Sequence, residues 1–218
     1  LSACGIQVVV PPAAGCCGAV KFHLNDQVGG LDHMRNNIDA WWPWVEQGVE
    51  AVVMNASGCG VTVKEYGHLL QHDAQYAEKA KRISELTRDL SELLPLCLPE
   101  LQKLLKPEVV AKTGLMAYHP PCTLQHGQKI KGQLEAMLGK LGISINTCQD
   151  SHLCCGSAGT YSVLQPELSK ELKKRKLANL MAGKPQAIAS ANIGCLGHLE
   201  SDATVDVRHW VEWVAQAV

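Results

Sequence analysis

Cysteine is the residue type with the clearest chemical potential in this chain. The 218 residues include ten cysteines, and four of these form adjacent pairs, Cys16-Cys17 and Cys154-Cys155, each followed by a glycine. Adjacent cysteines rarely bond to each other, because the ring that such a disulfide closes is strained. A chain of this length can also bury a core without disulfides. We therefore interpret the paired cysteines as metal ligands in a reducing compartment.

Four cysteines in the second half have the spacing of a ligand set: Cys122, then Cys154 and Cys155, then Cys195. Four thiolates suit either an iron–sulfur cluster or a tetrahedral zinc ion. Structural zinc sites usually contain short C-x₂₋₄-C pairs, which this set lacks. Adjacent cysteines also suit a cluster of several metal atoms better than one small ion. The spacing favours a [4Fe–4S]-type cluster, with zinc as the alternative.

The first half offers three further candidate metal ligands, Cys16, Cys17 and Cys59. The position that would correspond to Cys122 falls before Leu1. Cys4 is the nearest other thiol, but it lies beside a predicted strand and away from the place where a ligand is needed. We therefore expect an incomplete site in this half.

An internal repeat relates the two halves. The two cysteine pairs are offset by 138 residues, and the single cysteines, Cys59 and Cys195, are offset by 136. Such close agreement between two landmarks predicts a tandem duplication. We assign residues 1–94 to a first repeat that is truncated at its N-terminus and residues 113–218 to a second. The proline-containing segment 95–112 is interpreted as the linker.

The elements that must position these cysteines are alternating strands and helices. Short apolar segments with β-branched residues predict buried parallel strands at 6–10, 49–55, 115–118, 143–147 and 187–191. Helices are predicted at 28–47, 64–94, 123–141, 158–183, with a break at Pro166, and 205–217. This alternation predicts an α/β fold with mainly parallel sheets flanked by helices. Each single cysteine then follows the carboxyl end of a strand, where ligands collect in open α/β sheets.

Several other residues have simpler interpretations. Cys4, Cys97 and Cys148 have no repeat partner, and we expect them to be small buried apolar residues. The basic run Lys170–Lys176 is interpreted as the solvated face of a helix. His198 is interpreted either as a neighbour of the metal site or as a surface residue. His152 is a candidate neighbour of the ligands only because it lies just before the cysteine pair in the sequence.

Composition excludes several other classes of protein. The net charge is −1 and the isoelectric point is about 6.8, which gives no reason to expect nucleic acid as a partner. No apolar run approaches the roughly 20 residues of a transmembrane helix, and no signal peptide is recognisable. The sequence lacks the G-x-S-x-G, G-x-x-x-x-G-K-[ST] and H-E-x-x-H motifs of common hydrolases and nucleotide-binding enzymes. Because the first residue is Leu1, we interpret the chain as part of a longer protein.

The repeated cysteine motif resembles that of a known family. Paired Cys-Cys-Gly units, each followed 40 to 42 residues later by a strand ending in Gly-Cys, resemble the cysteine-rich (CCG) domain family, to which a heterodisulfide reductase subunit also belongs. Longer stretches are similar to the iron–sulfur subunits of bacterial glycolate oxidases (glycolate dehydrogenases). These stretches are Arg35–Pro43, Ala56–Gly60, Lys64–Gly67, Pro121–His126, Asp150–Tyr161 and Ala191–Cys195.

This resemblance implies a role in electron transfer. It implies that Cys122, Cys154, Cys155 and Cys195 bind the cluster, and that the intact subunit begins with a ferredoxin-like module. The implied partners are flavin-containing glycolate oxidase subunits, with FAD, that oxidise glycolate to glyoxylate, and quinone is the implied electron acceptor. We expect a cytoplasmic protein, peripheral at the inner face of the cell membrane, whose isolated chain turns over no substrate.

The chain departs from one feature of that family. Thr62 and His198 stand where members such as the heterodisulfide reductase subunit have the last cysteine of a C-x-x-C motif. The alternative functions are a zinc-binding docking module of a redox complex and a disulfide-reducing CCG domain.

Overall fold

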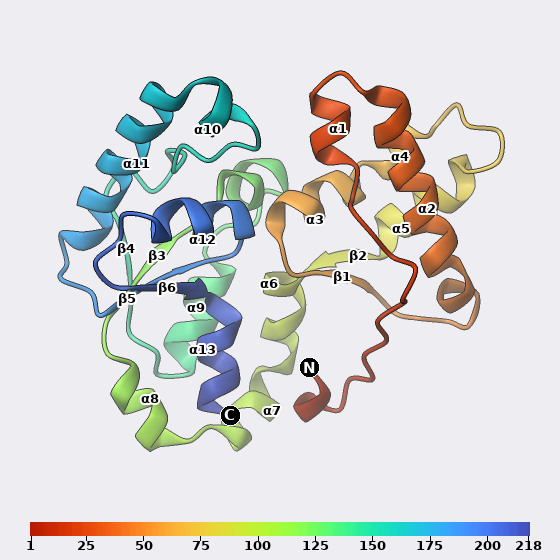
Figure 1. Cartoon of the computed structure of the whole chain (residues 1–218). Helices are drawn as coiled ribbons and strands as arrows, with labels where there is room; N and C mark the ends of the chain where they lie inside the picture. The colour runs from red at the N-terminus through yellow and green to blue at the C-terminus, as the bar shows by residue number, and fades with distance from the viewer. The chain divides into compact units, whose positions relative to one another are not determined.

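The computed structural model describes residues 1–218, which form two compact units, Leu1–Leu90 and Ser91–Val218 (Figure 1). Both units combine helices with parallel strands, which confirms the predicted α/β class. The segment 95–112, interpreted above as a linker, lies in the second unit and is mostly helical.

The first unit contains a small parallel sheet of two strands, β1 (Val52–Met54) and β2 (Thr87–Asp89). A 3₁₀ helix, η1 (Ser2–Cys4), opens the unit. Its α-helices are α1 (Ala19–His23), α2 (Gln27–Glu46), α3 (Ser57–Lys64), α4 (Tyr66–Leu69) and α5 (Ala77–Leu86). Met34, Ile38, Tyr66 and Ile83 are fully buried and form the centre of its core together with Cys17.

The second unit is built on four parallel strands in the order β4-β3-β5-β6. The strands are β3 (Met116–His119), β4 (Ile145–Thr147), β5 (Ala187–Ser190) and β6 (Asp206–His209). The helices are α6 (Leu90–Leu93) at the unit boundary, the 3₁₀ helix η2 (Leu94–Cys97), α7 (Leu98–Leu104), α8 (Pro107–Thr113), the π-helix η3 (Thr123–Gly127), α9 (Gln133–Lys140), α10 (Tyr161–Leu164), α11 (Pro166–Met181), α12 (Ile193–Glu200) and α13 (Trp210–Ala217).

The order of these strands creates a switch point between β3 and β5. The chain passes from β3 to β4 on one side, and β5 then pairs with the other side of β3, so that His119 is the register partner of Ser190. All residues of β3 and β5 are buried, which explains their short apolar sequences. In open α/β sheets, ligands bind at the carboxyl ends of the strands beside such a switch point.

One predicted strand and two predicted helices need correction. Residues 6–10 form no strand, and Val8 and Val10 are 49% and 82% exposed. Because this segment pairs with no other strand, its β-branched residues do not determine its structure. Conversely, β2 and β6 lie inside segments predicted as helices, 64–94 and 205–217. Both are short and contain charged residues, and each forms only by pairing with a neighbouring strand.

Several helices follow the predictions closely. The predicted helix 28–47 corresponds to α2, and Pro166 divides the predicted helix 158–183 into α10 and α11. Proline is well tolerated at the first turn of α11, since the amide hydrogen that it lacks would have no partner there. The predicted helix 123–141 is interrupted between η3 and α9. None of the helices combines the length and the apolar character needed to span a bilayer.

Candidate metal centre

In the second unit, potential ligands lie at or just after the carboxyl ends of two central strands, at the same edge of the sheet. Strand β3 ends with His119 and continues through Pro120 and Pro121 to Cys122. Strand β5 ends with Ser190, and Cys195 is the third residue of the helix that follows it, α12. The Ser190 hydroxyl donates a hydrogen bond of 2.9 Å to the His119 carbonyl, which ties the two strand ends together. The candidate residues therefore lie at the switch point of the sheet.

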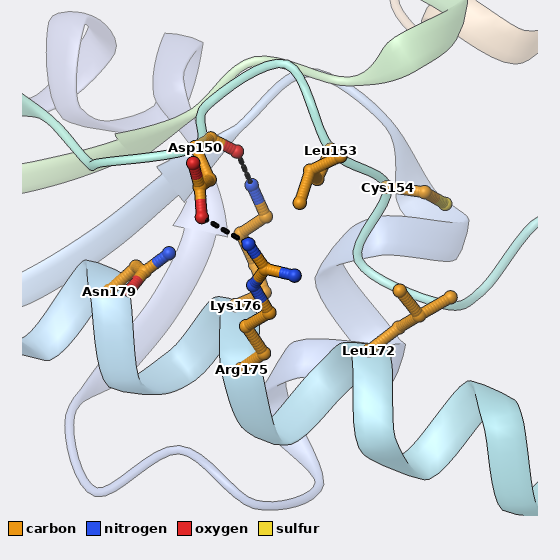
Figure 2. A pocket seen from close by; sticks show the side chains of 7 residues that line it. All are labelled: Asp150, Leu153, Cys154, Leu172, Arg175, Lys176 and Asn179. Atoms are coloured by element: carbon orange, nitrogen blue, oxygen red, sulfur yellow. Dashed lines mark hydrogen bonds and ion pairs between the residues drawn. The ribbon is translucent and has the colours of Figure 1, made fainter.

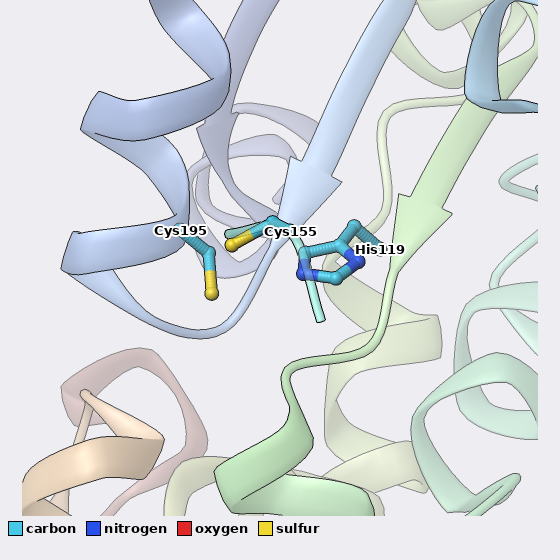
Figure 3. A group of neighbouring side chains, drawn as sticks. All are labelled: His119, Cys155 and Cys195. Carbon is cyan, nitrogen blue, oxygen red and sulfur yellow. The ribbon is translucent and has the colours of Figure 1, made fainter. Parts of the chain in front are cut away.

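The four cysteines predicted as ligands are brought together here. The Sγ atoms of Cys122 and Cys154 are 4.0 Å apart. The Sγ atoms of Cys155 and Cys195 and a ring nitrogen of His119 all lie within 4.8 Å of one another (Figure 3). The Cys155 thiol interacts with both Cys154 and Cys195 and so connects the two groups. Donors from three separate segments, the end of β3, the cysteine pair and α12, thus form one cluster.

Gly156 allows the cysteine pair to reach this cluster. Its φ is +98°, a conformation that favours glycine, and a Cβ atom added here would lie 2.4 Å from the carbonyl oxygen of Ser169 in α11. The Ser169 hydroxyl donates to the Gly156 carbonyl at 2.9 Å. The Gly156 amide donates to Cys154 Sγ at 3.3 Å. Close packing of the turn against α11 therefore directs the thiols inward.

The thiols differ in how readily they lose a proton. Hydrogen bonds from the thiols of Cys122 and Cys155 lower the pKa of Cys154. The Cys155 thiol also lowers the pKa of Cys195 to about 5, despite the burial of Cys195. In turn, the pKa values of Cys122 and Cys155 are raised, first by these hydrogen bonds and then by burial. Cys154 and Cys195 are therefore the cysteines that lose a proton most readily, and a bound cation would displace the remaining protons.

Helix α11 anchors the loop that precedes the cysteine pair. Lys176 Nζ donates to the Asp150 carbonyl at 2.7 Å, and Arg175 forms a 2.5 Å ion pair with the Asp150 carboxylate. Figure 2 shows these residues around a depression that Cys154 also lines. Lys176 is 2% exposed and Lys173 is 9% exposed, so the interpretation of Lys170–Lys176 as a solvated face is wrong for these two residues. Their ammonium groups bind Asp150, Ser201 and Asp202 instead.

The first unit repeats part of this arrangement. Cys59 is the third residue of α3, as Cys195 is of α12, and both helices follow a parallel strand. Cys59 hydrogen-bonds to Cys17, which lowers the pKa of Cys17 to about 6. Gly18 has a φ of +87°, and a Cβ atom added there would lie 2.5 Å from the carbonyl oxygen of Gly30. The exposed Cys16 also interacts with Cys17. The three cysteines predicted in this unit therefore gather as well.

The remaining cysteines lie outside these clusters. Cys97 and Cys148 are 7% and 8% exposed, as expected for small apolar residues, whereas Cys4 is half-buried in η1 and not in a core. His152 is exposed.

Two histidines near the cysteine pair differ in what they contact. His198 lies behind the cysteine turn, with Nε2 3.2 Å from the Ser169 hydroxyl. Burial lowers its pKa. The sequence interpretation missed His119, although its place at the end of a buried strand, three residues before Cys122, was a usable signal.

The donor set fits a metal centre. Four thiols and an imidazole suit both iron–sulfur clusters and zinc. Thiolates on a single tetrahedral ion lie about 3.8 Å apart, given metal–sulfur bonds of about 2.3 Å. The 4.0 Å between Cys122 and Cys154 is close to that value. A cluster binds its thiolates through different metal atoms, so it would need wider sulfur separations than these.

Comparison with known proteins identifies relatives of the whole chain. In Escherichia coli K12, the glycolate oxidase iron-sulfur subunit is 50% identical over 214 residues, which cover 98% of this chain and 51% of that protein. In Bacillus subtilis, the probable glycolate oxidase iron-sulfur subunit is 31% identical and covers 90% of this chain and 43% of that protein. Lactate utilization protein A of Geobacillus thermodenitrificans is 26% identical, and the match covers 88% of this chain and 77% of that protein. The chain thus spans about half the length of its glycolate oxidase relatives.

A family model described as a cysteine-rich domain, CCG, matches residues 1–64 and 116–200. The first match ends with α3 and the second with α12, the helices that carry Cys59 and Cys195. Each compact unit contributes one matched segment with its own Cys-Cys-Gly turn. The chain therefore belongs to the cysteine-rich (CCG) domain family.

Proposed function

We propose that this chain is the CCG region of the iron–sulfur subunit of a glycolate oxidase and that it relays electrons from flavin towards quinone. The observation that supports this most strongly is the convergence of four thiols at the switch point of the second unit. The similarity of this chain to two glycolate oxidase iron-sulfur subunits also supports the proposal.

The proposed ligands are Cys122, Cys154, Cys155 and Cys195, and the proposed cofactor is a [4Fe–4S]-type cluster. Such a cluster accepts and donates single electrons. The chain's own residues hold it and exclude water: Cys155 and Cys195 are 0% and 4% exposed. Low solvent exposure is one of the factors that set the reduction potential of such a centre. In the first unit, Cys16, Cys17 and Cys59 are a second, incomplete metal site.

The oxidation of glycolate to glyoxylate is assigned to partner subunits that carry FAD. That reaction releases two electrons together; the flavin would accept both and pass them one at a time to the cluster, which would relay them towards quinone. We place the complex in the cytoplasm, peripheral at the inner face of the cell membrane. The two repeats, 1–94 and 113–218, remain our proposed evolutionary units, joined by 95–112.

Metal analysis tests this function. Iron, acid-labile sulfide and zinc are measured per chain after anaerobic purification of the wild type and of the double variant Cys154→Ser/Cys155→Ser. The control is Cys97→Ser, which removes a buried thiol outside the cluster. About four iron and four sulfide per chain are expected for a [4Fe–4S] cluster, retained in the control and lost in the double variant. Wild type without iron and sulfide, even after anaerobic reconstitution, would contradict the proposal.

A zinc-binding docking module is the second candidate. The observation that favours it is the short separation of the donors, within 4.8 Å of one another for Cys155, Cys195 and His119. This spacing is closer to that of a single ion than to that of a cluster. Stoichiometric zinc without sulfide in the same analysis would support this candidate.

A further inference from the structure

His119 is a buried polar side chain without a well-formed hydrogen bond. It is 0% exposed, and neither Nδ1 nor Nε2 makes a hydrogen bond of normal geometry, although the ring lies close enough to Cys195 to lower the pKa of that thiol. Burial of an imidazole in this state is unfavourable, since both nitrogens have lost their hydrogen bonds to water and have no well-formed hydrogen bond in their place. Such a group in a native site indicates that a partner is missing from the polypeptide itself, such as a metal ion.

The position of this imidazole is set by rigid structure. His119 is the last residue of β3, a fully buried central strand, and its carbonyl accepts the hydrogen bond from Ser190. Pro120 follows directly and restricts the backbone at His119. The ring is directed towards Cys155 and Cys195 (Figure 3). The side chain is therefore held at the cluster by the sheet and not by a loop.

The distances fit shared coordination. A ring nitrogen and the two sulfurs lie within 4.8 Å of one another. Donors on one metal atom, with bonds of about 2.0 Å to nitrogen and 2.3 Å to sulfur, lie roughly 3.5–3.8 Å apart. Shifts of about 1 Å would therefore allow one metal atom to bind all three.

We propose that His119 is a ligand of the metal centre and binds it through a ring nitrogen beside Cys155 and Cys195. This rests on the proposed function only in assuming that the cysteines hold a metal centre, and it applies to a cluster as well as to a single ion. A nitrogen ligand is less electron-donating than a thiolate and adds no negative charge, so it raises the reduction potential of an iron centre.

The test uses pulsed electron paramagnetic resonance on the full chain labelled with ¹⁵N-histidine. The reduced cluster is examined, or the cobalt(II)-substituted site if the centre holds zinc. Wild type and the control His126→Gln, an exposed histidine in the same unit, should show the strong coupling of a directly bound nitrogen. His119→Cys should retain metal but lose this coupling, and for a cluster it should have a lower reduction potential.

A second variant separates ligation from a structural role. His119→Leu replaces an unpartnered polar group by an apolar one, so the metal-free protein should keep or raise its melting temperature. Metal affinity, measured by competition with a chelator, should fall at least tenfold. A large loss of metal-free stability with unchanged metal affinity would assign His119 a structural role and overturn the proposal.

The spectroscopic results distinguish this proposal from the proposed function. A wild-type centre with iron and sulfide, or with stoichiometric zinc, but without strong nitrogen coupling would overturn the role of His119 alone. A wild-type chain that binds no metal after reconstitution would overturn both.

Discussion

The two cysteines of each pair occupy different environments. Cys17 and Cys155 are 8% and 0% exposed, whereas Cys16 is exposed and Cys154 is half-buried. In both units the buried member hydrogen-bonds to the single cysteine of the following strand–helix unit, Cys59 or Cys195. The second cysteine of each pair therefore links the turn to the single cysteine, and the first is more accessible to solvent.

Thiol reactivity in the metal-free protein should follow this difference. The pKa of Cys154 is lowered by hydrogen bonds from Cys122 and Cys155, while that of Cys155 is raised. Because the thiolate is the reactive form, iodoacetamide at neutral pH should alkylate Cys154 faster than Cys155. Mass spectrometry of time points measures both rates. Metal loading should protect Cys154, and equal rates for the two residues would contradict the assignment of their protonation states.

Gly156 should be indispensable for the cysteine turn. Gly156→Ala places a Cβ atom 2.4 Å from the Ser169 carbonyl at a positive φ. We expect a loss of about 3 kcal/mol in the free energy of unfolding, from overpacking and backbone strain together. Chemical denaturation measures this value, and metal content should fall in parallel.

Gly159→Ala is the matched control. Gly159 also has a positive φ, +62°, but a Cβ atom there meets nothing within 4 Å. This variant should therefore lose only about 1 kcal/mol in the free energy of unfolding, from the strain of the left-handed backbone. Equal losses for the two variants would show that the contact with Ser169 is unimportant.

At the scale of elements, the site depends on the segments that follow three strands, β3, β4 and β5, and on the supporting helix α11. Strand β3 provides His119, the turn after it provides Cys122, and helix α12 after β5 provides Cys195; the loop after β4 provides the cysteine pair. Helix α11 fixes that loop through Lys176, Arg175 and Asn179, whose partners are all at Gln149 and Asp150. The helix thus supports the site without contributing a ligand.

Loss of this support should weaken metal binding. Lys176→Met removes the hydrogen bond to the Asp150 carbonyl, and it also removes a buried positive charge beside an anionic centre. We expect metal affinity to fall about tenfold, the lower end of the effect of residues that orient ligands. Competition with a chelator measures the affinity. Lys174→Met, an exposed position on the same helix, should have no effect, and a comparable loss there would point to general electrostatics instead.

At the scale of the molecule, two compact units each carry one group of cysteines. A ligand that binds only the folded state stabilises that state. At a ligand concentration of a thousand times its Kd, the free energy of unfolding rises by about 4 kcal/mol. If the complete donor set lies in Ser91–Val218 alone, metal should stabilise that unit preferentially.

Hydrogen exchange measures this difference. On metal loading, the amides of β3 and β5 should exchange at least tenfold more slowly, and those of β1 should change little. Cys122→Ser should abolish the protection of β3 and β5. Equal protection of both units would show either that the first site also binds metal or that the two units unfold together.

The sequence alone identified the cysteines that gather in each unit and the fold class. Paired cysteines, their repetition at nearly equal offsets and the apolar runs at 115–118 and 187–191 are local features, and local features are readable without a structure. Helices α3 and α12, which carry Cys59 and Cys195 as their third residues, were not among the predicted helices.

Only the tertiary structure decided which polar groups accompany the thiols. His119 joins the cluster because β3 pairs with β5, a contact between residues 71 positions apart that periodicity does not reveal. The same reason applies to the edge strands β2 and β6, which form only against a partner, and to segment 6–10, which lacks one. Lys176 is buried because α11 packs on the loop at Asp150, although its sequence is that of a solvated helix. Local sequence determines which groups are available, and long-range pairing determines which of them meet.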